Sequence, residues 1–506
     1  GYGQSRQGVS AVLAHLPILQ VIVPLMAAPA CLILRRPQLV WMFTLLASTI
    51  AFIISILLLQ QVMQTGTISY ELGGWSPPWG IEYRIDKLNA FIALIISGVS
   101  TVVLVAAHTS IEKEIPQEKH TLFYILYLLS LTGMLGIVTT GDAFNVFVFL
   151  EISSLSAYSL IALGRDRRAL WASFQYLIMG TIGATFILIG IGLMYQMTGT
   201  LNMVDLATRL PEVAETRTVT TAYVFFIVGV CLKLALFPLH LWLPNAYAHA
   251  PSIVTAFFAA TSTKVAAYLL IRFTFSIFGV SFSFTTLPME MVFLTLGLLG
   301  IFVASTVAIY QDNIKHVFAY SSVAQIGYMI VGFSMTTSAG LSAMLLHVFN
   351  HALMKGALFL ALGAVMLRVG STQLKDFQGL GRQMPLTMAA IVVGGLSLIG
   401  VPLTVGFVSK WYLVVAALEK GWWPVAGLVL LGSLLAVVYV WRIVETAYFK
   451  APLAPIAGKE QVKEAPMAFL LPVWMLVSAN VYFGLDTRLS VEIATAAAQS
   501  LFGVAP

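Results

Sequence analysis

The sequence GVCLKLALFPLHLWLPNAYAHAPSIVTAFFAATSTK occupies residues Gly229–Lys264 and is apolar enough to lie in a bilayer. It nevertheless carries Lys233 and Lys264 inside hydrophobic runs and is interrupted by three prolines. A lysine at the centre of a spanning helix costs about 2.5–3.5 kcal/mol on insertion scales, so it persists only where it is paired, hydrated or functional. Proline frees backbone carbonyls, which is tolerable beside a neighbouring helix or a water-filled cavity. The segment therefore indicates an ion or proton path through a membrane.

The composition of the 506 residues predicts a polytopic membrane protein. The chain is 59% hydrophobic and only 9% charged, whereas soluble chains carry about 25% charge. Basic residues do not cluster with aromatic ones, so the net charge of +6 indicates positive cytoplasmic loops and not nucleic-acid binding. Cys31 and Cys231 cannot supply a four-thiolate cluster, and we predict no cofactor and no bound metal.

Hydrophobic runs predict an all-α fold of about 14 transmembrane helices. The first run is too long for a signal-peptide core and lacks a small-residue cleavage site. Helices 7 and 12 are expected to break, at Pro238 and at Gly400-Val401-Pro402. Residues 65–87 predict an outer β-hairpin, and residues 198–218 and the tail from Asp486 predict amphipathic stretches. The predicted spans are 13–34, 39–62, 88–110, 120–140, 143–163, 170–196, 219–240, 251–278, 289–310, 315–335, 339–368, 386–417, 423–449 and 466–485.

Two interrupted helices in corresponding positions are the sequence sign of an inverted repeat. We therefore divide the chain into N-terminal helices with the outer hairpin (1–118), a first five-helix repeat (119–279), a second five-helix repeat (280–450) and a final loop, helix and tail (451–506). Lys and Arg are about twice as frequent in one set of connections as in the other, which predicts that both termini lie outside.

Glu151 lies in the middle of the fifth predicted span. A protonated carboxyl bonded to nearby serines would explain it, but a carboxylate paired with a buried lysine, most simply Lys233, is the functional alternative. Snorkelling to the headgroups would explain a lysine near a helix end. It suits Lys233 and Lys264 poorly, because each has apolar sequence on both sides.

His347, His351 and Lys355 follow one another at intervals of four and lie on one side of the eleventh span. Two histidines at this spacing can share a metal, but the glutamate of a metalloprotease motif is absent. A proton relay is the better interpretation, because neutral histidine both donates and accepts. Lys410 could extend the series, although snorkelling competes there, and His240 and His316 are candidate proton-entry residues.

The chain contains no Walker motif, nucleophile elbow or dinucleotide fingerprint. We therefore expect a transporter subunit and not an enzyme, with energy supplied by an ion gradient or by a partner protein in the same complex.

Five motifs, in one order along the chain, carry a family resemblance. They are FVFLEISSLSAYSL, KLALFPLHLWLPNAYAHAPSIVTAFFAATSTK, DNIKHVFAYSSVAQIGYM, HVFNHALMKGALFLALG and VPLTVGFVSKW. The chain resembles the antiporter-like proton-translocating subunits of Mrp-type Na⁺/H⁺ antiporters, membrane-bound hydrogenases and respiratory complex I. Within that group it is most similar to the D subunit of Mrp antiporters, because complex I relatives usually have Asp at the position of Asn245.

The resemblance implies 14 helices with inverted five-helix repeats, a Glu151–Lys233 pair, a central Lys264 and a polar line through His347, His351 and Lys355 to Lys410. It also implies a multisubunit complex in a prokaryotic-type plasma membrane, exchanging protons for a monovalent cation, most simply Na⁺. The alternative is the pumping arm of a redox-driven complex. A structural subunit that conducts nothing is a third interpretation, which the insertion cost of the buried charges disfavours.

Overall fold

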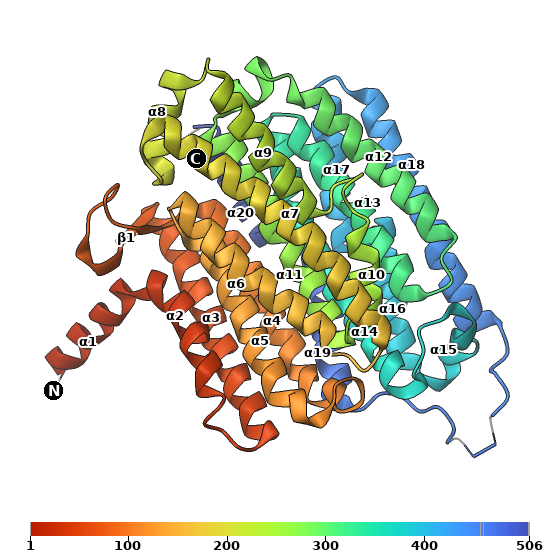
Figure 1. Cartoon of the computed structure of the whole chain (residues 1–506). Helices are drawn as coiled ribbons and strands as arrows, with labels where there is room; N and C mark the ends of the chain where they lie inside the picture. Colours follow the sequence, from red (N-terminus) through yellow and green to blue (C-terminus); the bar gives the residue numbers. More distant parts are fainter. Residues whose placement is uncertain (1, 456, 459, 504–506) are drawn as a thin grey trace.

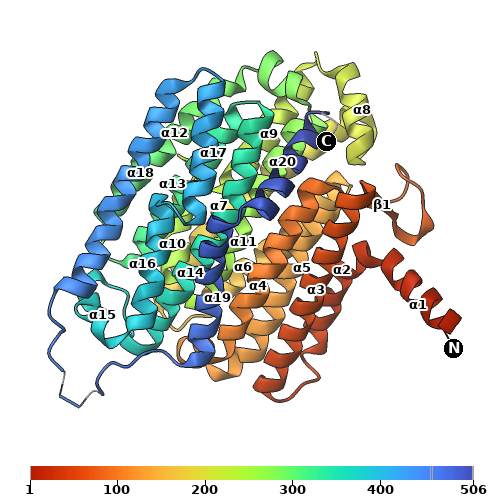
Figure 2. The ribbon, with the colours of Figure 1, turned by 180° about the vertical axis from the view of Figure 1, so that it is seen from behind.

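The computed structural model describes residues 2–455, 457–458 and 460–503. The chain forms a bundle in which the N-terminal helices lie on one flank and α12 (Met289–Ile309) and α18 (Trp423–Val444) lie on the opposite flank (Figures 1 and 2). The all-helical membrane fold predicted from the sequence is confirmed.

The remaining elements follow in chain order. The first half contains α1 (Tyr2–Ala14), α2 (Leu16–Ala30), α3 (Pro37–Thr65), β1 (Ile68–Glu71), η1 (Leu72–Gly74), β2 (Glu82–Ile85), α4 (Lys87–Glu114), η2 (Gln117–Lys119), α5 (His120–Thr139), α6 (Ala143–Ala162), α7 (Arg167–Thr198), α8 (Met203–Val213), α9 (Arg217–Leu234) and α10 (Trp242–His249). The second half contains α11 (Ser252–Ile271), η3 (Arg272–Ile277), η4 (Phe282–Thr286), α13 (Ile314–Ser334), α14 (Ser338–Val369), η5 (Leu374–Phe377), α15 (Leu380–Gln383), α16 (Pro385–Ile399), α17 (Val405–Glu419), η6 (Glu445–Phe449), α19 (Met467–Leu485) and α20 (Arg488–Leu501).

Twelve of the described helices are long and apolar enough to cross a membrane, or thirteen if the bent pair α1–α2 is one span. The sequence predicts about fourteen, and that number stays a prediction. The first predicted span, 13–34, is not one straight helix, because Gln7–Ala14 and Leu16–Ala30 meet at 77°. His15 lies at the bend, and its Nδ1 is 2.7 Å from the Tyr70 hydroxyl on β1. Pro17 lies in the first turn of α2 and marks the bend in the sequence, although the predicted span runs through it.

The connection between α3 and α4 is the predicted β-hairpin. Strands β1 and β2 pair antiparallel, with Ile68 opposite Ile85 and Glu71 opposite Glu82. The buried Glu82 carboxylate accepts from the Ser69 hydroxyl at 2.5 Å and from the Asn202 side chain at 2.9 Å. Asn202 is the N-cap of α8, so this carboxylate fastens the hairpin to the predicted amphipathic stretch.

Both predicted helix breaks are present. After α9 the backbone turns at Ala235, whose φ is +63°, and the Trp242 indole donates to the freed Leu232 carbonyl at 2.9 Å. The predicted span 386–417 consists of α16 and α17, which are separated at Gly400, whose φ is +92°. Glycine adopts a left-handed backbone without steric cost, so Gly400 determines where the second break occurs.

Burial identifies the centre of the bundle. In their most apolar windows, the span containing α11 and the span α13 are 94% buried, whereas α7 and α18 are 39% buried. Helix α14 packs against both α11 and α13. The lysines and histidines singled out in α11 and α14 therefore lie in the interior and not on the lipid-facing surface.

Candidate ion-translocation pathway

Lys233 lies in the last turn of α9 and is 7% exposed. Its ammonium group donates to the Ser154 hydroxyl at 3.0 Å and to the Tyr158 hydroxyl at 3.3 Å. Both partners belong to α6, one and two turns after Glu151, so all three residues share a face of that helix. The sequence did not single out Ser154 or Tyr158, since serine and tyrosine are ordinary residues in membrane helices.

Glu151 itself is partly buried on α6. Within the described part of the chain, its carboxylate forms no ion pair with Lys233 inside 4.0 Å. The structure thus brings the two residues to the same helix face but has Lys233 bonded to neutral hydroxyls. The pairing expected from the resemblance stays a prediction.

A small cavity lies beside Lys233. Its volume is about 30 Å³, enough for about two water molecules. Lys233 from α9, Ser154 from α6, Tyr176 from α7 and Ser262 from α11 contribute polar atoms to the lining. Ser262 precedes Lys264 by two residues, so the cavity lies between the two lysine-bearing helices.

Lys264 is completely buried on α11. Its ammonium nitrogen lies 2.6 Å from the Ala259 carbonyl, 3.2 Å from the Thr263 hydroxyl and 2.8 Å from Nδ1 of His351. The rings of His351 and His347 are nearly parallel, with centroids 6.2 Å apart. Two of the predicted relay residues, His351 and His347, are therefore neighbours of Lys264 across the α11–α14 contact, and Lys264 is the central lysine that the resemblance implies.

His347 connects this group to α13 and α17. Its Nδ1 is 2.6 Å from the Ser409 hydroxyl, and its Nε2 is 2.8 Å from the Gln325 side-chain oxygen. The Tyr328 ring is 6.0 Å from the His347 ring, and the ammonium of Lys410 lies 4.6 Å from the Tyr328 centroid. Tyr328 thus lies between His347 and Lys410, and sequence spacing could not reveal it because it belongs to another helix.

Lys410 uses the break between α16 and α17. Its ammonium donates to the Leu398 carbonyl at 2.8 Å and to the Ile399 carbonyl at 3.2 Å. These carbonyls end α16, where helical hydrogen bonding stops. Lys410 is 6% exposed, so snorkelling to the membrane surface does not describe its position here.

Lys355 is fully buried one turn beyond His351 and points to α13. Its ammonium donates to the Phe318 carbonyl at 2.6 Å and contacts the Ser321 hydroxyl. It therefore belongs to a side branch of the row that runs from Lys264 to Lys410.

The two candidate entry residues both lie at α13, since the His240 ring is 6.5 Å from the ring of Tyr320, one turn after His316. His240 occupies the α9–α10 break, stacked on Phe237 with ring centroids 5.3 Å apart. His316 begins α13, where its ring is 5.6 Å from that of His249. Next to it, Lys315 is 2% exposed, although its position in the sequence suggests an inner-loop cation.

Asp166, the N-cap of α7, lies beside His249, the neighbour of His316. Its carboxylate is 3.9 Å from Nδ1 of His249. Burial alone would raise the pKa of Asp166, but hydrogen bonds from Arg168 and the charge of Arg168 hold that pKa below its ordinary value. The described residues include no grouping of three or more His, Cys, Asp or Glu suited to a metal ion.

Fold and site together define a polytopic helical membrane protein whose centre holds a row of titratable side chains. The family described as NADH:quinone oxidoreductase/Mrp antiporter, transmembrane, matches residues 140–436. The chain belongs to this family and is an antiporter-like subunit of a multisubunit membrane complex.

Two curated relatives show how the family divides. The chain is 42% identical to the N subunit of NADH-quinone oxidoreductase from Desulforudis audaxviator, over 93% of this chain and 96% of the relative. It is 32% identical to the D subunit of the Na⁺/H⁺ antiporter from Alkalihalophilus pseudofirmus, over 85% and 86%. The predicted likeness to the D subunit of Mrp antiporters is confirmed, but the higher identity to an oxidoreductase N subunit leaves the preference drawn from Asn245 unresolved.

Two solved structures share the fold. One is the Mrp complex from Dietzia, with a TM-score of 0.88 and 24% identity, covering 97% of this chain and 98% of the other. The second is the membrane-bound sulfane sulfur reductase, an archaeal respiratory membrane complex, with a TM-score of 0.87, 32% identity and 97% coverage of both chains.

Proposed function

We propose that this chain translocates protons along its buried row of lysine and histidine side chains, within an assembly that exchanges protons for a monovalent cation, Na⁺. The 2.8 Å contact of Lys264 with His351, together with the His347 ring stacked 6.2 Å from the His351 ring, carries this proposal. Lysine ammonium and neutral imidazole can pass a proton between them, and each member of this group is shielded from lipid by other helices.

Proton movement along the row would be coupled electrostatically, because the charge on one side chain changes the protonation of its neighbour. At a separation of about 6 Å and an effective dielectric constant near 20, one unit charge changes its neighbour's energy by roughly 3 kcal/mol. That energy corresponds to about two pKa units, enough to change the protonation of a group poised near neutrality. We propose that Lys233 alternates between the Ser154–Tyr158 hydroxyls and the Glu151 carboxylate, and that this alternation drives Lys264.

Na⁺ as the exchanged cation is supported by the relatives named as D subunits of Na⁺/H⁺ antiporters. A second candidate is the pumping arm of a redox-driven complex, in which other subunits hold the redox centres. It is favoured by the 42% identity to an oxidoreductase N subunit and by the likeness to the sulfane sulfur reductase. In both cases we propose a bacterial-type plasma membrane location.

The test is proton movement in vesicles that carry the whole complex, driven either by a Na⁺ gradient or by an electron donor. Lys233→Ala and Glu151→Ala are compared with wild type and with Lys113→Ala, whose side chain is exposed. Assembly is verified by pull-down. Lost transport in the first two variants, with assembly intact, supports the pathway, whereas unchanged transport would assign conduction to a partner. The effective driving force distinguishes antiport from redox pumping.

A further inference from the structure

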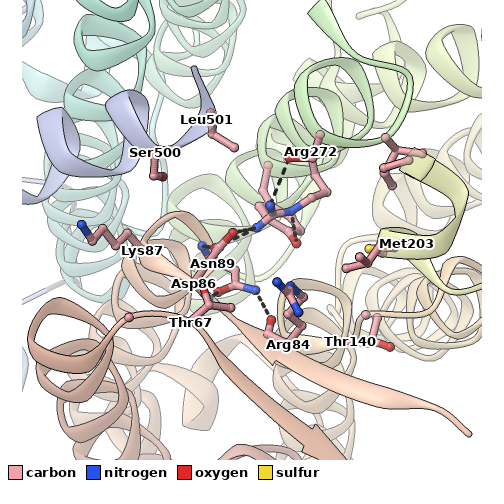
Figure 3. A pocket seen from close by; sticks show the side chains of 17 residues that line it. Thr67, Arg84, Asp86, Lys87, Asn89, Thr140, Met203, Arg272, Ser500 and Leu501 are labelled. Carbon is pink, nitrogen blue, oxygen red and sulfur yellow. Dashed lines mark hydrogen bonds and ion pairs between the residues drawn. The ribbon is translucent and has the colours of Figure 1, made fainter. Parts of the chain in front are cut away.

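A second polar site lies at the hairpin end of the molecule, where the span that carries Lys264 ends. It is a cavity of about 440 Å³ between the hairpin, α4, η3, α8 and α20 (Figure 3). This volume is within the range of small-molecule sites. Figure 3 shows Arg84, Asp86 and Arg272 gathered at the centre of the lining, with Met203 and Leu501 near its edges.

The charges of this cavity are unbalanced. Its lining includes three cationic side chains, Arg84, Lys87 and Arg272, and one carboxylate, Asp86. Asp86 is already committed, because its two oxygens accept from Arg272 Nη2 at 2.7 and 2.8 Å. Within the described residues, the guanidinium of Arg84 and the ammonium of Lys87 have no hydrogen-bond or ion-pair partner. Arg84 and Lys87 are partly buried, and the lining carries a net positive charge, which favours binding of an anion.

The position of the cavity indicates which anion fits. The span Lys87–Glu114 begins at the cavity and the span Ser252–Ile277 ends at it, so it lies near the level of lipid headgroups. Thr67 and Ser276 add hydroxyl groups, and Met203 and Leu501 add apolar surface. The planar fork of an arginine matches phosphate oxygens in pairs.

We propose that this cavity binds a phosphate group, with Arg84 as the ligand near its centre, Lys87 as a second positive charge in its lining, and the Asp86–Arg272 pair as the support that holds α4 and η3 together. The phosphate could be the headgroup of an anionic phospholipid or free inorganic phosphate. The apolar edge accommodates the start of the acyl chains of a lipid, and the cationic centre accommodates the phosphate in either case.

The experiment uses the whole complex, purified with its partner proteins and depleted of lipid. Binding is measured by native mass spectrometry and by titration, with phosphatidylglycerol, phosphatidylcholine and inorganic phosphate as separate probes. The variant Arg84→Gln/Lys87→Gln is compared with Arg217→Gln, an exposed arginine at the start of α9. We expect the double variant to weaken phosphatidylglycerol binding at least tenfold, while Arg217→Gln and the phosphatidylcholine control show no such effect.

The remaining outcomes separate the two sources. If inorganic phosphate binds with the same dependence on Arg84 and Lys87, and phosphatidylglycerol does not, free phosphate is the ligand. If wild type binds neither probe, or the double variant binds both as tightly as wild type does, the proposal is wrong. Should the double variant fail to assemble, Ala207→Phe fills the cavity from α8 and keeps every charge. It must produce the same loss, and undiminished binding would overturn the proposal.

Discussion

Lys264 has no exposed surface, and all of its hydrogen-bond partners are buried groups. A charge in such a place depends on those few contacts, because the surrounding medium cannot replace them. The same holds for Lys355 and, with slight exposure, for Lys233 and Lys410. The chemistry that each lysine can perform is therefore set by two or three named neighbours.

His351→Phe should interrupt the row. The change removes the nitrogen that lies 2.8 Å from the Lys264 ammonium but keeps a ring in the buried space. Losing a hydrogen bond to a charged group costs about 1.5–3 kcal/mol, so we expect transport in vesicles to fall roughly ten- to a hundredfold. The matched change His108→Phe alters a half-exposed histidine outside the row and should leave transport near wild type. Equal activity of both variants would remove His351 from the pathway.

Gly180→Ala should disturb the Lys233 site from α7. A Cβ at this position would overlap the Tyr158 hydroxyl and lie 3.2 Å from the Lys233 ammonium, so both groups must move. We expect transport to decrease on the order of tenfold, since small displacements at a reacting group are costly. Gly192→Ala on the same helix is the control, because nothing lies within 4 Å of its added methyl. The comparison is made by transport assay and by the yield of assembled complex.

The sequence predicted the charged members of the site but not their neutral partners. Lys233, Lys264 and Lys410 are conspicuous because the cost of inserting a charge makes an accidental lysine improbable. Ser154, Gln325 and Tyr328 carry no such cost, and their roles depend on which helices meet. Residue spacing predicts the helix face on which Glu151 lies. It does not predict which atom on that face Lys233 binds, because that depends on how the helices pack.

At the scale of the helices, the two breaks share one feature. Each leaves backbone carbonyls without a helical hydrogen bond, and a side chain donates to them. Trp242 binds a freed carbonyl at the first break, and Lys410 binds two at the second. The starts of two further helices are capped from distant segments. The Glu114 carboxylate accepts from the Ser252 backbone at the start of α11, and Glu464 accepts from Leu386 and Thr387 at the start of α16.

Gly400→Ala should damage the second break. Its φ of +92° is unfavourable for alanine, and a Cβ there would lie 3.0 Å from the Lys410 side chain. A residue held in such a backbone region costs about 1–3 kcal/mol, so we expect a lower melting temperature of the complex and reduced transport. Gly427→Ala in α18 has open space around it and should be neutral or slightly stabilising. If Gly400→Ala melts and transports like wild type, Lys410 does not depend on this turn.

In the molecule as a whole, the hairpin lies at one end and α15, with residues 450–455, lies at the other (Figure 1). His15 contacts the hairpin, and Ser500 and Leu501 line the cavity beside it, so both terminal helices reach the same end. An even number of crossings fits this arrangement. We propose that the hairpin end faces outward and that residues 119–279 and 280–450 are the two five-helix repeats.

Cysteine labelling tests this orientation. Ser76→Cys in the exposed hairpin should react with a membrane-impermeant maleimide in intact cells, and Ala454→Cys in the opposite loop should react only after permeabilisation. The native Cys31 and Cys231 are buried and should contribute little background. The reverse pattern of labelling would invert the proposed topology.

Hydropathy predicted most of the fold because each helix must satisfy its own backbone in lipid. It predicted the break at Gly400-Val401-Pro402 because glycine and proline mark it in the sequence. It missed the bend at His15, because hydropathy alone does not register Pro17 in the first turn of α2 or the contact of His15 with Tyr70, more than fifty residues away. Contacts between distant segments leave no periodic pattern in the chain.

The unequal burial of the helices has a consequence for the bilayer itself. The spans containing α11 and α13 are 94% buried, whereas the spans of α7 and α18 are 39% buried and expose more surface to the acyl chains. Stretching or thinning of the surrounding lipid acts first on such exposed helices, through tilt and hydrophobic mismatch. We expect the central lysine–histidine row to be less affected by a change in membrane thickness than these outer helices are.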